Sequence, residues 1–155
     1  MGRLVTTDST GTQRARLRRT IAEALKRLMA KGDLDDEARD LAALIVYVLR
    51  EIAEGVEKSA SAWDKRHYYI KADRLRADWD WADRFADRLA NLLVVEDWGR
   101  VPLALAQLAP RFADVNVVKL TRSSALWNGA YDRLVQETRA ARRAAAADAG
   151  ESATS

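Results

Sequence analysis

The chain has 155 residues, 48% of them hydrophobic and 32% charged, and its formal net charge is +3. It contains no cysteine, which excludes disulfides, thiolate zinc sites, iron–sulfur clusters and cysteine nucleophiles. Its longest uninterrupted apolar stretch, at 41–49, is far below the roughly 20 residues that span a bilayer, and its first residues lack the apolar centre of a signal peptide, so we expect a soluble, cytoplasmic protein without membrane contact.

Basic and acidic residues are unevenly distributed along the chain. Residues 1–31 hold eight Lys or Arg against two acids, which gives this segment a net charge of +6. Residues 32–115 carry a net charge of −5, and residues 116–155 carry +2. The excess of positive charge therefore lies at the two ends of the chain.

Two amphipathic helices are predicted in the first half of the chain. A Thr-, Ser- and Gly-rich arm at 1–11 is expected to be disordered. After it, apolar residues recur at steps of three and four and predict a helix at 12–31. A second, longer series predicts a helix at 35–64, which opens with acidic residues that suit the positive end of the helix dipole.

The third helical pattern is the most regular one. Apolar residues alternate steps of four and three from Tyr68 to Leu93, which predicts one helix at 67–95. The register of the second helix does not continue into this series, so a turn is expected between Lys65 and His67. Two long helices joined by so short a turn are expected to form an antiparallel hairpin.

The last third of the chain predicts a short helix followed by a longer one. Two prolines delimit the short helix at 101–112. A renewed apolar series predicts a helix at 121–145, with Thr121 or Ser123 as its N-cap. The Ala-rich end at 146–155 is expected to be a disordered tail.

These elements predict an all-α fold. We expect a mainly antiparallel bundle of four principal helices, with a long central helical hairpin and one short extra helix, in a single domain at 12–145. Helices of nearly thirty residues are long for a monomer of this size. Homodimerisation through the hairpin would bury the apolar seam that the shorter helices leave uncovered.

Aromatic residues are concentrated between Trp63 and Phe85, a segment that holds six of the eleven Phe, Trp and Tyr residues among many charged ones. Aromatic side chains beside Arg and Lys serve either as core packing or as a surface on which a partner stacks. Tyr68, Leu75 and Trp79 follow the helical seam and are interpreted as core residues. Four other side chains lie off that seam or beside the expected turn and are the candidate binding residues: Trp63, His67, Tyr69 and Trp81.

No catalytic or metal-binding motif accompanies the aromatic cluster. His67 is the only histidine, and the ligand spacings of HExxH helices and EF-hand loops do not occur. Asp80, Asp83 and Asp87 lie at helical spacing, but Arg84 and other basic neighbours make a solvated charged face the simpler interpretation. We therefore predict a protein that is not an enzyme and holds neither a metal nor another cofactor.

Two functions remain in accord with the sequence. The first is a non-enzymatic protein-interaction or scaffold module that binds a protein partner or a second copy of itself. The alternative is a small basic helical subunit that binds nucleic-acid phosphates without sequence specificity inside a larger assembly. Arg14, Arg18 and Lys26 are the candidate phosphate contacts, because they lie away from the apolar face of the first helix. The competing interpretation is that these cations pair with the acidic middle of the chain.

Overall fold

The structure, a computed structural model, describes residues 10–154, and all regular structure in this range is helical. The elements in chain order are α1 (Thr10–Met29), α2 (Asp36–Lys65), α3 (Tyr69–Trp79), α4 (Trp81–Val94), α5 (Val101–Leu108), the 3-10 turns η1 (Ala109–Phe112) and η2 (Ser124–Leu126), and α6 (Ala130–Thr154). The predicted all-α bundle is thus confirmed. None of the described helices combines the length and the apolar character that crossing a membrane requires.

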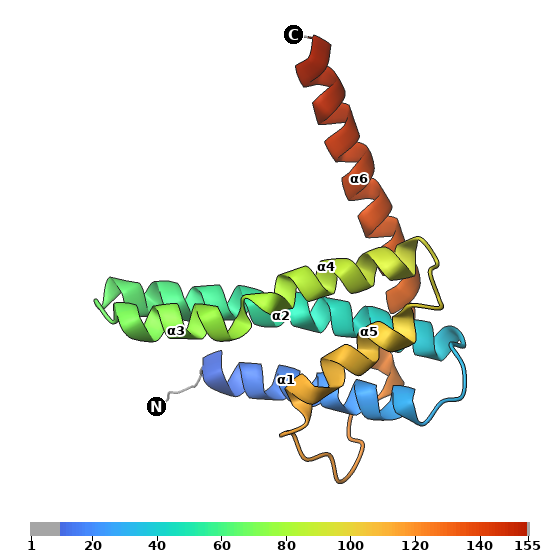
Figure 1. Cartoon of the computed structure of the whole chain (residues 1–155), viewed down its shortest axis with the longest axis horizontal. Helices are drawn as coiled ribbons and strands as arrows, with labels where there is room; N and C mark the ends of the chain where they lie inside the picture. The colour runs from blue at the N-terminus through green and yellow to red at the C-terminus, as the bar shows by residue number, and fades with distance from the viewer. Residues whose placement is uncertain (1–9, 155) are drawn as a thin grey trace, which may run out of the picture.

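Helix α2 is the centre of the bundle. It begins after Asp35, whose carboxylate accepts a hydrogen bond from the Ala38 amide at 2.8 Å and so caps the helix. Helices α1, α3, α4 and α6 all pack against it (Figure 1). Because neighbours surround it, every residue at 41–46 is buried, and these side chains form the middle of the hydrophobic core.

A tight turn around His67 joins α2 to α3, as the sequence predicted. The Tyr68 amide donates a hydrogen bond to the Trp63 carbonyl at 2.9 Å, and the His67 amide donates one to the Asp64 carbonyl at 3.0 Å. His67 has a φ of 65°. This is the Schellman arrangement, in which glycine usually occupies the position with positive φ. The two helices form an antiparallel hairpin whose end extends past the other helices (Figure 1).

The predicted single helix at 67–95 is instead two helices, α3 and α4, separated at Asp80 (Figure 1). In one straight helix Trp79 and Trp81 would lie on nearly opposite faces. The break lets their rings stack, with centroids 5.6 Å apart and an interplanar angle of 25°. Aromatic packing therefore accompanies the departure from the regular heptad pattern.

Tyr68 was predicted in the core but is 56% exposed. The reason is tertiary, because α3 packs against α2 and the end of the hairpin reaches beyond the other helices (Figure 1). The heptad seam is correct closer to the bundle, where Ala82, Ala86 and Leu89 are buried.

Helix α6 begins later than predicted. The segment 121–129 holds only the short turn η2, and Gly129 has a φ of 78° just before the helix begins. The amides of Gly129 and Tyr131 donate hydrogen bonds to the Asp40 carboxylate at 3.2 and 2.9 Å. A side chain of α2 therefore caps α6, in place of the predicted Thr121 or Ser123.

Helix α6 also ends later than predicted and projects away from the bundle (Figure 1). The segment 146–154 is helical, although a disordered tail was expected, because alanine has the highest intrinsic helix propensity. At the other end of the chain, Thr10 and Gly11 already belong to α1, and the rest of the predicted arm lies outside the described residues.

Candidate interaction surfaces

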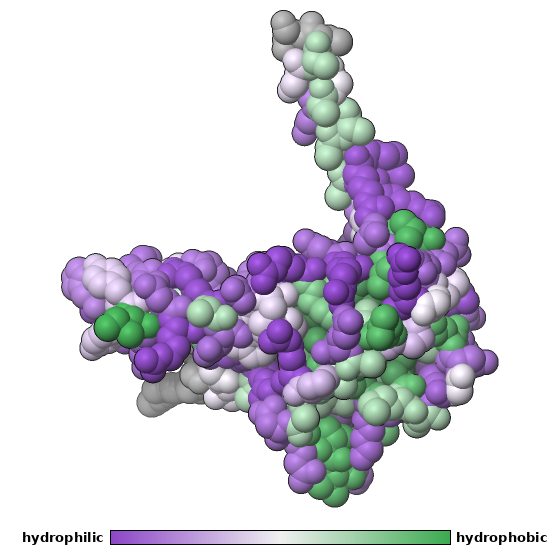
Figure 2. Space-filling view, in the orientation of Figure 1, coloured by the Kyte–Doolittle hydropathy of each residue, from purple (hydrophilic) through white to green (hydrophobic). Residues whose placement is uncertain are grey.

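The hairpin tip, defined as residues 57–76, exposes large apolar side chains. Tyr68 is 56% exposed, Tyr69 54% and Ile70 78%. Figure 2 shows one small hydrophobic area at this end of the hairpin, with hydrophilic surface around it. An apolar centre within a polar rim is the composition of protein-binding surfaces.

Arg76 binds all three acidic side chains of the hairpin tip. Its guanidinium donates hydrogen bonds to Glu57 at 3.0 and 3.1 Å and to Asp64 at 2.8 Å, and lies 3.6 Å from Asp73. The hydrogen bonds to Glu57 and Asp64 raise the pKa of Arg76, and the bond from Arg76 lowers the pKa of Glu57. All three acidic side chains of the tip are thus ion-pair partners of the same arginine.

The other basic residues of the tip remain without a carboxylate partner. Residues 57–76 contain six basic and three acidic side chains, which gives a net charge of +3. Apart from Arg76, no cation of the tip forms an ion pair with a described residue: these are Lys58, Lys65, Arg66, Lys71 and Arg74. The exposed apolar side chains thus share the tip with positive charge that no carboxylate neutralises.

Three of the four candidate binding residues lie together at the tip. Trp63 is half-buried, with the Lys71 ammonium 4.4 Å from its ring centroid. His67 is exposed, and its Nδ1 lies 2.8 Å from the Tyr69 hydroxyl. His67 has a clear structural role as the cap residue of the turn. Within residues 10–154, no three acidic or histidine side chains gather in a group that could hold a metal ion.

Trp81 lies apart from the other three candidates. It opens α4, beyond the break at Asp80, whereas Tyr69 lies at the start of α3. Besides stacking on Trp79, its ring meets the edge of Phe112 with centroids 6.3 Å apart, and its Nε1 donates a hydrogen bond to the Asp78 carbonyl at 3.1 Å. Trp81 therefore fastens α4 to η1, a contact between distant segments that helical spacing could not reveal.

The basic residues of α1 fasten the connection between η1 and η2 to the bundle. Arg18 donates hydrogen bonds to both Asp114 carboxylate oxygens, at 2.6 and 3.0 Å, and Lys26 donates one to the Val117 carbonyl at 2.8 Å. Arg14 is half-buried, and burial lowers its pKa. Arg18 and Lys26, both candidate phosphate contacts, thus already bind acceptors of their own chain.

Glu23 is the centre of this arrangement and was missed in the sequence. It is 1% exposed and accepts hydrogen bonds from the Thr121 amide at 2.6 Å, the Thr121 hydroxyl at 2.7 Å and the Arg122 amide at 3.0 Å. Arg19 also donates to it at 2.9 Å. Burial by itself would raise the pKa of Glu23, but these hydrogen bonds outweigh burial and lower it to about 2. The sequence did offer one indication of its burial, because Glu23 lies next to the apolar residues of α1.

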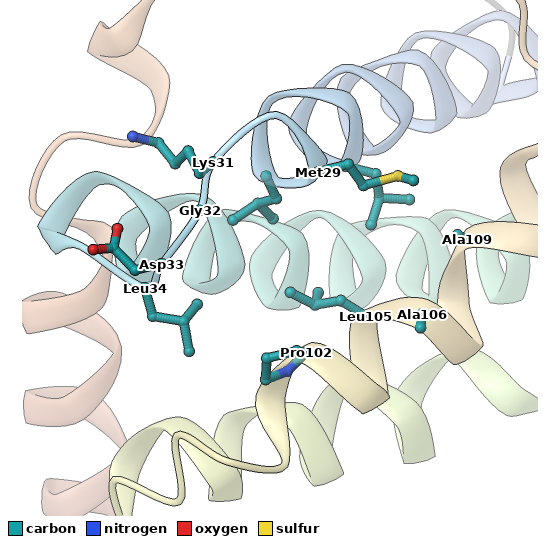
Figure 3. Close-up of a pocket in the computed structure, with 11 residues that line it drawn as sticks. Met29, Lys31, Gly32, Asp33, Leu34, Pro102, Leu105, Ala106 and Ala109 are labelled. Atoms are coloured by element: carbon teal, nitrogen blue, oxygen red, sulfur yellow. The ribbon is translucent and has the colours of Figure 1, made fainter.

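An apolar groove opens between the end of α1 and α5 (Figure 3). Its volume is about 390 Å³, and its lining includes Leu25, Met29, Pro102 and Leu105. Met29 is 77% exposed. Its charged neighbours turn their charged groups away from the space (Figure 3). The groove suits apolar side chains in general. Lys31 and Asp33 belong to its lining, but their charged groups point away from the space and so do not select one partner.

Comparisons with protein-family models, with the curated proteins and with the solved structures each found no match. The geometry of the described residues is therefore the basis for assigning a function.

Proposed function

We propose that this protein is a non-enzymatic helical interaction module that binds an acidic surface of a protein partner with its hairpin tip. One observation carries the proposal. Tyr68, Tyr69 and Ile70 are exposed at the end of the hairpin, among cations that have no carboxylate partner in residues 10–154. Exposed aromatic anchors with a charged rim provide affinity and steering at protein interfaces.

Two ionisable groups of the tip, Glu57 and Arg76, support a non-catalytic role. Glu57 has a lowered pKa and Arg76 a raised one, so each is held in its charged form near neutral pH. A general acid or base needs a pKa near the working pH. The shifts at the tip therefore stabilise an ion-pair network and prepare neither group to transfer a proton.

Nucleic acid is the alternative partner. Free lysines and arginines contact phosphates, and tyrosines stack on bases. Two features favour a protein instead. Ile70, the most exposed of the large apolar side chains at the tip, has no flat face for stacking, and Arg18 and Lys26 of α1 bind their own chain.

Self-association is a separate proposal and requires another surface. Two tips with a net charge of +3 each repel one another, so a second copy is a poor occupant of the tip. A homodimer through the sides of the long hairpin avoids this repulsion, and sedimentation equilibrium at high micromolar concentration tests it. We also place the module in the cytoplasm, in keeping with a chain that has no cysteine.

Site-specific photo-crosslinking tests the tip. A benzophenone side chain at Tyr68, in the source cells, is expected to form an adduct with one defined acidic protein. The same group at Leu103, an exposed apolar position on α5, is the matched control and is expected not to form that adduct. With the purified pair, Ile70→Ser is expected to weaken binding about 30-fold, a loss typical of an interface hot spot. Val118→Ser, at a similarly exposed position, is expected to leave it unchanged.

Other outcomes separate the alternatives. Adducts with nucleic acid, together with an affinity that falls steeply with salt, would favour the phosphate-binding function. Adducts with a second copy would favour self-association through the tip. If position 68 formed no adduct beyond those of position 103, the proposal would be wrong.

A further inference from the structure

A second pocket lies away from the hairpin tip, between α4 and the segment that holds α5 and η1. It encloses about 330 Å³ and is lined by Trp81, Arg84, Phe85, Arg88, Gln107 and Arg111. The first four residues follow helical steps of three, one and three, so they share one face of α4. We call this site the arginine pocket.

Aromatic rings and one amide hold two of the three arginines in place. The Arg111 guanidinium lies 4.1 Å from the Trp81 ring centroid, and the Arg88 guanidinium lies 5.1 Å from that of Phe85. Arg88 also donates a hydrogen bond to the Gln107 side-chain oxygen at 2.5 Å. These contacts fix the cations without neutralising them.

The arginine pocket has an excess of positive charge. No carboxylate is among its lining residues. Of these residues, Arg84 alone forms an ion pair within residues 10–154, with Asp80 at 3.9 Å. Within residues 10–154, neither Arg88 nor Arg111 forms an ion pair. Three like charges around one hollow repel each other, and an anion bound between them would remove that repulsion.

We propose that the arginine pocket binds a small phosphate-bearing ligand. A guanidinium presents paired donors that match two oxygens of a phosphate, and a phosphate monoester carries enough charge to engage several arginines at once. Trp81 and Phe85 supply apolar surface in the lining for the organic part of the ligand. This site shares no residue with the hairpin tip, so the inference is independent of the proposed function.

Calorimetric titration with AMP, inorganic phosphate and adenosine tests the arginine pocket in the full chain. AMP is expected to bind with one-to-one stoichiometry, phosphate more weakly, and adenosine not at all at the same concentrations. Arg84→Gln and Arg88→Gln are each expected to weaken AMP binding about 10-fold or more, because each removes charge-assisted hydrogen bonds. Arg88→Lys, which keeps the charge but loses the paired donors, is expected to lie between wild type and Arg88→Gln.

Two controls keep the result specific. Arg100→Gln removes an equally exposed arginine that pairs with Asp97 outside the pocket, and is expected to bind AMP as wild type does. Ile70→Ser changes the tip alone and is also expected to retain AMP binding. Circular dichroism and thermal unfolding establish that each variant is folded.

Several outcomes would overturn the assignment of the arginine pocket. These are adenosine binding as tightly as AMP, wild-type AMP affinity in both Arg→Gln variants, or an equal loss in Arg100→Gln. Binding of a short single-stranded oligonucleotide without any binding of AMP would assign the positive charge to nucleic acid instead.

Discussion

The hairpin tip and the basic face of α1 are both rich in lysine and arginine, yet these residues do different work in the two regions. On α1, Arg18 and Lys26 find acceptors in the connection between η1 and η2, and Glu23 binds the same connection from its buried position. At the tip, Arg76 pairs with all three acidic side chains, so the neighbouring basic residues have no carboxylate partner. Basic residues stabilise the fold where a distant segment of the chain supplies hydrogen-bond acceptors for them. Where no segment does so, they are available to a partner.

Removing the carboxylate of Glu23 is expected to have the largest effect. Glu23→Gln keeps the size of the side chain but loses the charge that four donors share, so the free energy of unfolding is expected to fall by about 3 kcal/mol or more. Urea denaturation measures this change in the free energy of unfolding. Asp114→Asn, at an exposed carboxylate that also accepts from α1, is the control and is expected to cost much less. Equal losses in the two variants would contradict the central position of Glu23.

The pH dependence of stability is the next prediction. The folded-state pKa of Glu23, about 2, lies below its ordinary value of 4.5, so its contribution is complete above about pH 4.5 and is lost as the pH falls toward 2. The loss is on the order of 3 kcal/mol. Denaturation midpoints measured across this range are expected to fall more steeply for wild type than for Glu23→Gln. Parallel curves for the two proteins would refute the assignment.

Neutralising two cations in each region compares the regions directly. Arg18→Gln with Lys26→Gln is expected to lower the free energy of unfolding by about 1 to 2 kcal/mol, because hydrogen bonds to the Arg111 and Val117 carbonyls are lost. Differential scanning calorimetry measures the effect.

The matched variant at the hairpin tip, Arg66→Gln with Arg74→Gln, has the same change of charge. It is expected to alter stability by less than about 0.5 kcal/mol, since neither side chain has an ion-pair partner among residues 10–154. If both double variants were equally destabilised, the distinction between used and free cations would fail.

One substitution is expected to raise stability instead of lowering it. His67 holds a φ of 65° in the cap of α2, and glycine adopts that conformation without steric cost. His67→Gly is therefore expected to stabilise the fold by about 1 kcal/mol and to leave partner binding intact. Urea denaturation and the affinity of the crosslinked partner measure the two parts. A loss of binding with unchanged stability would show that the imidazole itself contacts the partner.

Several elements could be predicted from the sequence because they depend on local forces. The bounds of α1 and α2 lie within two residues of those predicted, and the segment 101–112 is helical as expected. The turn near His67 was found because the apolar register changes there, and a change of register needs no knowledge of distant residues.

The candidate binding site was predictable in part. Trp63, His67 and Tyr69 lie at one end of the hairpin because the turn brings them together. Trp81 was grouped with them by nearness in sequence, but it packs against η1, about thirty positions further along the chain. The sequence pattern did not indicate Glu23, Arg111 or Gln107 as site residues, because their partners or their shared pocket come from other segments.

The sequence by itself determined the helical class, the position of the hairpin turn and the clustering of aromatic and basic residues, since spacing and propensity act within a few turns of helix. Only the tertiary structure decided which of those residues are available. The exposure of Tyr68, the use of Arg18 and Lys26 by their own chain and the capping of α6 by Asp40 all depend on which segments pack side by side. A side chain is available to a partner only where no distant segment of its own chain packs against it or binds it.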